Sequence, residues 1–363
     1  MIKIYQINEN HKRQINKIDE KLIPFQEINI DLKRKLHIIK KSIDTLDNKD
    51  WELAKKKVNE YEYIYTSSKI ERNICSIVPV SRSYFKLYEI IKDLLKLNNN
   101  YKCSCLAEGP GGFIHCLNDN NVELVYGITL ISRNNKKIPY WNQLITTNKT
   151  NKLCYGSDRT GNIYNLDNVD FFINLVDKNY CEIVTADGGF DYSTDYNSQE
   201  DMSYKLLYCE IFTALNIQQR NGSFIIKFFD LFNYHTIKLL YILYNCYEKV
   251  IIYKPLTSRL SNSEKYIICK GFLGKNKDII NMLRSYYKEP LNLFIDIPQS
   301  FINNIKDYNV LYTNKQYDCI NTIIEYIKNG KLDDKPSKDQ ISLAKKWCEL
   351  YQLPINKNCI YNE

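Results

Sequence analysis

The feature that most constrains this chain is the alternation of helix-like and strand-like segments between about residues 83 and 272. The amphipathic helical segment SYFKLYEIIKDLLKL is followed by the short strand YKCSCLAE, and the alternation continues to the apolar runs GSFIIKFFD, KVIIYKP and KYIICKGF. Strands that alternate with helices are typical of an α/β domain with a mainly parallel sheet. Because only a short polar segment joins the last two strands, an antiparallel pair is expected at one edge.

The two ends of the chain do not follow this pattern. Residues 1–65 are strongly charged, and DLKRKLHIIKKSIDTL carries apolar residues at helical spacing. We interpret them as a small helical unit docked on the main domain, with a separate binding module as the alternative. After about residue 275 the alternation is lost. There, SKDQISLAKKWCELYQ predicts a terminal helix with Ser337 at the N-cap and Gln340 completing a capping box.

These patterns divide the chain into three parts. We expect a helical N-terminal extension over 1–65, a main domain over 66–275 and a helical C-terminal extension over 276–363. The main domain begins with a connector at 66–82, which contains serines and a proline. No internal repeat is visible.

Composition limits the class of protein. Of the 363 residues, 44% are hydrophobic and 25% are charged, as in ordinary globular chains. Lys+Arg 50 against Asp+Glu 42 gives a net charge of +8, which suits a polyanionic partner but is also common on proteins that bind no nucleic acid. The 12 cysteines contain no CxxC pair and are interpreted as small core residues, and His 4 leaves few metal ligands, so no metal is expected.

Targeting signals are not expected either. The N-terminus lacks the apolar segment of a secretory signal, and no apolar run approaches the roughly 20 residues that span a bilayer. We expect a soluble intracellular protein without a membrane partner. Its predicted compartment is the cytoplasm, or a virion or viral factory if the source is viral, with the nucleus as an alternative. The richness in Ile, Asn, Lys and Tyr favours an AT-rich genome, either of a large DNA virus or of a protist.

A glycine-rich turn follows the first strand of the alternation. In LAEGPGGF, residues 106–113, the strand runs into the turn and a helix begins at once. Glycines let a backbone approach a ligand closely, and open α/β sheets bind cofactors beyond the carboxyl ends of their strands. The turn is neither GxGxxG nor a P-loop, which disfavours NAD and ATP. A purely structural turn is the alternative.

Four charged residues have distinctive contexts around this turn. Asp187 follows a strand and precedes two glycines, and Lys227 stands inside an apolar strand, where an unpartnered lysine is rare. Glu264 enters the last strand, and Lys86 lies off the apolar stripe of its helix. Taken one at a time, Asp187 is explained as a turn-former and Lys227 as a lysine of an edge strand. Glu264 and Lys86 are explained as solvated side chains. Together the four residues give the order Lys-Asp-Lys-Glu.

With this order, the chain resembles the FtsJ/RrmJ-like, S-adenosylmethionine-dependent RNA ribose 2′-O-methyltransferases, which carry a Lys-Asp-Lys-Glu tetrad. The closer resemblance is to the viral and eukaryotic cap-specific mRNA (nucleoside-2′-O-)-methyltransferases. It rests on AEGPGGF, YGITL, TADGGFD, KFFDLF and KPLTSRLSNSEKYIICKG, over about residues 80–275. The resemblance implies a Rossmann-like fold with a mostly parallel seven-stranded sheet and an antiparallel edge strand. It also implies methyl transfer to the ribose 2′-OH of a 5′-terminal nucleotide of capped mRNA (cap-1 type).

The resemblance also implies site residues. The catalytic tetrad would be Lys86, Asp187, Lys227 and Glu264, with Lys227 as the base. An acidic residue that the family places near adenine falls at Asn162, with Asp158 as the rival position, and VYGITL lacks the acidic residue that often holds the cofactor ribose. The residues expected to bind S-adenosylmethionine are Ala107, Glu108, Gly109, Pro110, Gly111, Gly112, Phe113, Thr129, Leu130, Asp158, Asn162, Ile163 and Asp187.

The implied partner is the 5′ end of capped mRNA, with other capping enzymes as further candidates; the oligomeric state stays open. The positive charges of SRNNKK, namely Arg133, Lys136 and Lys137, are candidates for phosphate contacts, with a solvated loop as the alternative. The residues expected to touch RNA lie near the start of the first helix and in the segment that leads to Glu264: Arg82, Tyr84, Lys254, Thr257, Ser258, Arg259 and Asn262.

The chemistry sets a demand on the base. A free lysine has a pKa of about 10.4, so its neutral form lies about 4.6 kcal/mol uphill at pH 7. We expect Lys86, the cofactor sulfonium and partial desolvation to lower the pKa of Lys227, while Asp187 and Glu264 raise it and orient the lysines. The alternatives are a second-nucleotide (cap-2) enzyme, a ribosomal RNA enzyme and a catalytically silent RNA-binding scaffold.

Overall fold

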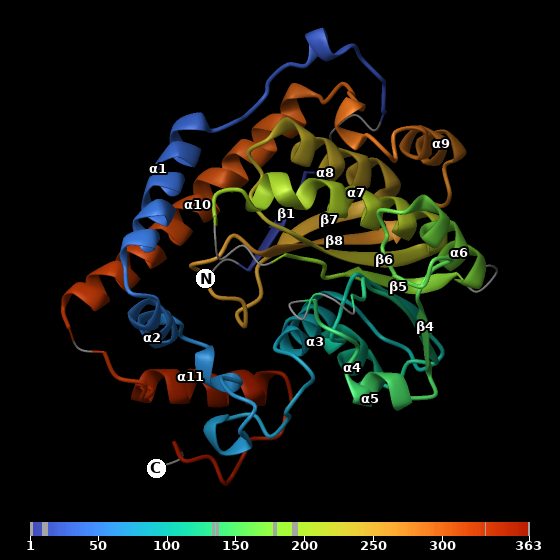
Figure 1. The fold of residues 1–363 in the computed structure, drawn as a ribbon. Coiled ribbons are helices and arrows are strands. Elements are labelled where there is room, and N and C mark those ends of the chain that lie inside the picture. Colours follow the sequence, from blue (N-terminus) through green and yellow to red (C-terminus); the bar gives the residue numbers. More distant parts are fainter. Residues whose placement is uncertain are drawn as a thin grey trace.

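The computed structural model describes residues 3–8, 14–132, 135, 138–176, 180–190, 195–330 and 332–361. Within these residues, one 8-stranded sheet has the strand order β1-β7-β8-β6-β5-β2-β3-β4 (Figure 1). The strands are β1 (Ile4–Gln6), β2 (Lys102–Leu106), β3 (Leu124–Ile128), β4 (Asn151–Cys154), β5 (Cys181–Ala186), β6 (Gln218–Phe228), β7 (Tyr247–Tyr253) and β8 (Lys265–Phe272).

The sheet is mostly parallel, which confirms the predicted fold class. β4, β3, β2, β5 and β6 pair in parallel, and β8 is antiparallel to both β6 and β7, as expected for two strands joined by a short segment. β8 lies between β6 and β7, and the antiparallel edge strand is β1. The expected number of seven strands is therefore corrected to eight. Ile4–Gln6 lie in the segment expected to be helical, and a strand of three residues leaves no periodicity to read.

Helices cover both faces of the sheet (Figure 1). One face packs against α3 (Ser83–Leu94), α4 (Gly112–Asp119) and α5 (Gln143–Thr147). The other face packs against α6 (Leu166–Val176), α7 (Gln199–Ile217), α8 (Tyr234–Cys246) and α9 (Lys277–Ser285). Short 3-10 helices occur at η1 (Glu20–Leu22), η2 (Ile43–Thr45), η3 (Glu62–Ile64), η4 (Ile70–Arg72) and η5 (Pro290–Asn292).

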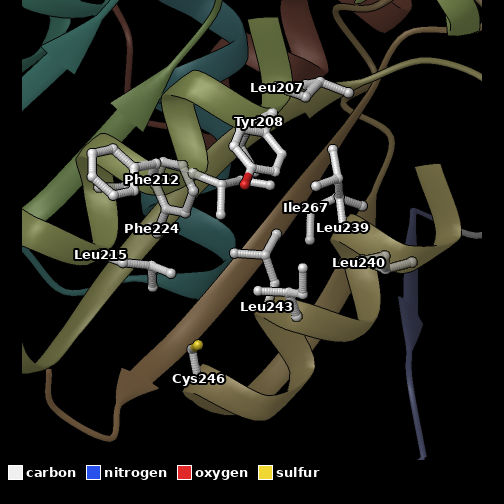
Figure 2. Packing of buried hydrophobic residues seen from close by; sticks show 14 of the residues in the cluster. Leu207, Tyr208, Phe212, Leu215, Phe224, Leu239, Leu240, Leu243, Cys246 and Ile267 are labelled. Atoms are coloured by element: carbon white, nitrogen blue, oxygen red, sulfur yellow. The ribbon is translucent and has the colours of Figure 1, made fainter. Parts of the chain in front are cut away.

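The central strands are apolar on both faces because both faces are covered. Ile225 packs on the side of α3 and α4, whereas Phe224 and Ile226 pack on the side of α7 and α8. Figure 2 shows the core on the α7 and α8 side of the sheet. Side chains of these helices, among them Phe212 and Leu243, converge there on the sheet. This two-sided burial explains why the strand around Lys227 has no polar alternation in the sequence.

The terminal extensions pack on each other beside the sheet. α1 (Ile30–Ser42), α2 (Asn48–Val58) and α10 (Gln299–Lys328) lie together in Figure 1 and share a separate apolar cluster. This cluster contains Leu36 and Ile39 of α1, Trp51 of α2 and Ile320 of α10. α11 (Lys338–Leu350) has the predicted capping box between Ser337 and Gln340. The domain boundaries stay a prediction.

Two further expectations concern the whole chain. All 12 cysteines are free thiols, and only Cys319 is not fully buried, in line with core residues. In the part of the chain that the structure describes, no helix is long and apolar enough to cross a membrane.

Candidate active site

Two ion pairs meet at the carboxyl end of the parallel strands. Asp187 directly follows β5, and Lys227 stands near the end of the adjacent strand β6. The Lys227 Nζ lies 3.2 Å from Asp187 Oδ1 and donates to the Asp187 main-chain carbonyl at 2.9 Å. Lys86 of α3 lies with its Nζ 2.7 Å and 2.8 Å from the two carboxylate oxygens of Glu264. The four predicted catalytic residues are thus brought together as two pairs.

The pairs share one electrostatic field. Burial lowers the pKa of Lys227, but the charges of Asp187 and Glu264 outweigh this effect and raise its pKa above the ordinary value. Burial raises the pKa of Glu264, and the charges of Lys86, Lys227 and Lys254 lower it to a net value of about 2. The protein alone therefore favours the ammonium form of Lys227. The expected raising effect of Asp187 and Glu264 thus exceeds that of burial, and the lowering expected from Lys86 and the cofactor sulfonium stays a prediction.

Neighbouring side chains orient the two carboxylates. The Tyr266 hydroxyl donates to Asp187 Oδ1 at 2.9 Å, and the Ser258 hydroxyl donates to Glu264 Oε1 at 2.8 Å. Ser258 is only 2% exposed, and its hydroxyl is directed at this carboxylate. Such contacts restrict the rotation of each carboxylate and thereby the position of the lysine paired with it.

The glycine-rich turn is shaped by steric need. Gly111 has φ +110, a left-handed conformation that favours glycine. At Gly112, a Cβ would lie 2.2 Å from the hydroxyl oxygens of Ser81 and Ser83. The Glu108 carboxylate accepts hydrogen bonds from the main-chain N–H groups of the first turn of α4, at Phe113 and Ile114. The turn thus holds the helix against the strand that precedes it.

A cavity of about 600 Å³ opens beside this turn and reaches Lys227. Its volume is that of a small-molecule site. Leu130 and Ile163 give it apolar walls, while Glu108, Asn162 and Asp187 add polar groups. This mixture fits a ligand with an aromatic base, a sugar and a charged amino-acid end, as in S-adenosylmethionine.

The cavity includes part of the predicted cofactor set. Asp158 is outside its lining, because it lies in a turn where its carboxylate accepts from Thr160 N, Thr160 Oγ1 and Asn165 Nδ2. The predicted residues that line the cavity are Ala107, Glu108, Gly109, Thr129, Leu130, Asn162, Ile163 and Asp187. Those that are not in its lining are Pro110, Gly111, Gly112, Phe113 and Asp158.

Other lining residues were missed. Gly188 and Gly189 follow Asp187, and the glycine pair was a visible signal. At Gly161, a Cβ would lie 1.8 Å from the Thr129 carbonyl oxygen, so this glycine permits contact between two loops. The remaining missed residues have no local signal: Ser81, Ser83, Asn135, Ile138, Pro139, Tyr164, Phe190 and Leu206.

A further carboxyl group lies behind the site. Glu210 of α7 is 0% exposed, and a Cβ on Gly188 would lie 2.3 Å from its Oε1. Neither of its oxygens accepts a well-formed hydrogen bond among the described residues, although the Gly188 amide is near enough to lower its pKa. Burial dominates and raises the pKa of Glu210 well above its usual range, with the Lys227 charge opposing it. Glu210 is therefore a buried carboxyl group with a raised pKa next to the Asp187–Lys227 pair, and nothing in YCEIF signalled it.

The residues predicted to touch RNA occupy mostly interior positions. Tyr84 is 1% exposed and donates to Asp119. Thr257 donates to Glu89, and the Lys254 Nζ donates to the main-chain carbonyls of Asn262 and Glu264.

The remaining RNA candidates divide into three groups. Arg82 and Arg259 both pair with the buried carboxylate of Glu62. Asn262 has an exposed side chain. Arg133, Lys136 and Lys137 lie outside the described residues.

The residues for which the structure gives a placement contain no group of three or more His, Cys, Asp or Glu side chains that could hold a metal ion.

Comparison with known proteins gives three findings. The model of the family described as FtsJ-like methyltransferase matches residues 79–272. The cap-specific mRNA (nucleoside-2′-O-)-methyltransferase 1 of Trypanosoma brucei brucei is 30% identical over 250 residues, covering 64% of this chain and 65% of that protein. The protein of the same name from Dictyostelium discoideum is 30% identical over 355 residues, covering 90% of this chain and 46% of that protein.

The chain thus spans less than two thirds of the length of these curated relatives. Both come from eukaryotes, and the expectation of a viral source stays a prediction. A solved ribosomal RNA methyltransferase from Plasmodium falciparum aligns with a TM-score of 0.39 at 19% identity, over 53% of this chain and 98% of that one. The family match contains both ion pairs, the glycine-rich turn and the strands that carry them, and so the chain belongs to the FtsJ-like methyltransferase family.

Proposed function

We propose that this protein transfers the methyl group of S-adenosylmethionine to the ribose 2′-OH of a 5′-terminal nucleotide of capped mRNA, as in cap-1 formation. The observation that carries the proposal is the placement of Lys227. This half-buried lysine lines the 600 Å³ cavity and is paired with Asp187, and the charge of Glu264, the partner of Lys86, raises its pKa. The names of the relatives supply the capped substrate.

In this proposal, the cavity holds the cofactor. Bound S-adenosylmethionine would supply an electrophilic methyl group. Leu130 and Ile163 would contact its base, Asn162 would hydrogen-bond without charge, and the turn at Glu108 and Gly109 would face its amino-acid end. The closeness of the turn to Lys227 would place the reacting end of the ligand at the catalytic lysine.

Lys227 would serve as the base for the 2′-hydroxyl. Bound S-adenosylmethionine would supply the methyl group to the hydroxyl oxygen and leave as the thioether, and the neutral Lys227 Nζ would take the hydroxyl proton. The positive charges of Lys86 and of a bound sulfonium would both favour that neutral form. They would oppose the charges of Asp187 and Glu264, which raise the pKa of Lys227. Asp187 orients the amine through its side chain and its main-chain carbonyl. Alignment of oxygen, methyl carbon and sulfur supplies the larger part of the acceleration.

The test is methyl transfer to matched short RNAs. The protein is incubated with isotope-labelled S-adenosylmethionine and one RNA sequence carrying a 7-methylguanosine cap, an unmethylated guanosine cap or a 5′-triphosphate. The methylated ribose is then located by nuclease digestion and mass spectrometry. We expect label on the first transcribed nucleotide of capped RNA.

Other outcomes would contradict the proposal. Label on the second nucleotide would assign a cap-2 enzyme, and transfer only to uncapped structured RNA would assign a ribosomal RNA enzyme. Binding of RNA and cofactor without any transfer would assign a silent scaffold. Lys92→Ala, an exposed lysine on α3, is the matched control for lysine substitutions in the site.

A further inference from the structure

The segment 254–264, here named the Glu264 loop, joins β7 to β8 and ends at Glu264. It is held from below by another carboxylate, Glu89 of α3, which is 0% exposed. Glu89 accepts hydrogen bonds from Leu256 N at 2.7 Å and from Thr257 N at 3.3 Å. The same carboxylate receives Trp347 Nε1 of α11 at 3.4 Å and lies 2.8 Å from Lys3 Nζ. Lys3 and Trp347, from near the two ends of the chain, therefore meet at the carboxylate that binds this loop.

A second buried carboxylate holds the middle of the loop. Glu62 of η3 is 0% exposed and pairs with Arg259 of the loop at 2.7 Å and with Arg82 at 2.9 Å. Burial would raise the pKa of Glu62, but the two guanidinium groups lower it to about 2. Glu62 is therefore ionised, and it ties the loop to the N-terminal extension.

The third contact lies next to Glu264 itself. Lys40 of α1 donates to Ser263 Oγ and to Asp230, both at 2.8 Å, and Ser263 donates to Asp230 at 3.0 Å. Gln316 of α10 donates to the Ser261 carbonyl at 3.1 Å and to Ser263 Oγ at 3.2 Å. Lys40, Ser263 and Gln316 are 3%, 2% and 7% exposed. In Figure 1, α1 and α10 lie side by side beyond this end of the sheet.

From these contacts we propose that α1 and α10 are positioning elements of the active site, and that Gln316 holds the Glu264 loop in its productive conformation. This inference rests on the proposed role of the tetrad in methyl transfer. Gln316 lies outside the lining of the 600 Å³ cavity, and its side-chain amide donates to Ser261 and Ser263 of the loop, so it acts through these two residues. A buried polar network is satisfied only when all of its members are in place, and it therefore selects one loop conformation.

The consequence for catalysis follows from the Lys86–Glu264 pair. The position of Glu264 sets the position of the Lys86 Nζ, 2.7 Å away, and contributes to the field at Lys227. A displacement of about 1 Å in a catalytic arrangement lowers rates by as much as roughly a hundredfold. Gln316 is the best residue to test because it is neutral, and replacing it changes no charge at the site.

The experiment compares Gln316→Met with Gln340→Met in the full chain. Gln340 of α11 is 4% exposed, and its amide donates to the carbonyls of Lys56, Lys57 and Asn59. Both glutamines are buried to a similar degree, but Gln340 joins the two extensions to each other, whereas Gln316 joins the C-terminal extension to the Glu264 loop. Methionine keeps the side-chain length and removes the hydrogen bonds in both variants.

For Gln316→Met, we expect the single-turnover methyl-transfer rate to fall about tenfold or more with unchanged affinity for S-adenosylmethionine. Amide hydrogen exchange should speed up in peptides that cover 254–264. For Gln340→Met, we expect a similar loss of melting temperature but a rate within about twofold of wild type. In a Glu264→Gln background, Gln316→Met should lower the rate no further, because the two residues act in series.

Equal rate losses in the two methionine variants, or full additivity with Glu264→Gln, would overturn the proposal. If Gln316→Met does not fold, Ser263→Ala is the second variant, because it removes the hydroxyl that Lys40 and Gln316 share. It should show a smaller rate loss and a smaller increase in amide exchange of the loop. If the wild-type chain transfers no methyl group, the proposed function fails. The exchange comparison then still decides whether α10 holds the loop, and unchanged exchange would overturn this inference separately.

Discussion

The two ion pairs of the candidate active site are built in different ways. The Asp187–Lys227 pair belongs to the sheet, because parallel neighbouring strands β5 and β6 deliver both residues to the same edge. The Lys86–Glu264 pair joins a helix to a loop, and that loop depends on buried charges from distant parts of the chain. The sheet-built pair is fixed by strand register, whereas the loop-built pair depends on tertiary packing of the extensions. Substitutions should therefore affect the two pairs differently.

The largest effect is expected at the sheet-built pair. Lys227→Met removes the amine while keeping the length of the side chain, and we expect the methyl-transfer rate to fall by about a thousandfold. Affinity for S-adenosylmethionine should stay near that of wild type, measured by isothermal titration calorimetry. Lys92→Ala should keep wild-type turnover. Near-normal turnover by Lys227→Met on capped RNA would remove this lysine from the mechanism.

The loop-built pair should give a smaller loss and a distinctive pH dependence. In Glu264→Gln, we expect a rate loss of about a hundredfold from the misplaced Lys86. Because the Glu264 charge raises the pKa of Lys227, its removal lowers that pKa, and the rate should reach its alkaline plateau at a lower pH. Single-turnover rates across a pH series measure this shift. An unchanged profile would mean that the two pairs act independently.

The pH dependence of stability follows from the same carboxylate. The folded-state pKa of Glu264 is about 2, below the ordinary value of 4.5, so its ionised form stabilises the fold above about pH 4.5. This contribution is lost as the pH falls through the folded-state pKa. We expect the midpoint of urea unfolding to fall less between pH 5 and pH 3 in Glu264→Gln than in wild type. Equal slopes in both proteins would contradict the assigned ionisation.

The smallest effects are expected where the cofactor would bind. Asn162→Ala should weaken binding of S-adenosylmethionine by about three- to tenfold, the effect of one hydrogen bond. Asp158→Asn should change it by less than about twofold, because Asp158 lies outside the cavity lining and holds its own turn. Calorimetry on both variants measures which of the two positions contributes more to the affinity for S-adenosylmethionine. A stronger effect at Asp158 would reverse the assignment.

The sheet-built pair and its surroundings could be predicted from sequence. Asp187 before two glycines and Lys227 in an apolar strand are local signals, and parallel topology places strand ends together. The residues that support the loop-built pair could not be predicted, because Lys40, Glu62 and Gln316 look like ordinary residues of charged helical segments. Their meaning arises only when α1, η3 and α10 pack against the Glu264 loop.

The direction of the pKa shift of Lys227 could not be predicted from the sequence either. The sequence indicated Asp187 and Glu264 beside Lys227, but not that their charges outweigh the effect of burial on its pKa. The residues expected to contact RNA show the same difficulty. Arg82 and Arg259 have the right chemistry for phosphate, but each pairs with the buried carboxylate of Glu62. Residue type indicates what a side chain can bind, and packing decides what it does bind.

The position of β8 has a consequence for the order in which the molecule assembles. β8 lies between β6 and β7, although it follows both in the chain. Until residues 265–272 have been synthesised and inserted, β6 and β7 both keep open hydrogen-bonding edges at the centre of the future sheet. Glu264 directly precedes β8 and arrives with it. Insertion of β8 therefore closes the centre of the sheet and brings Glu264 to the other three charged residues in the same step.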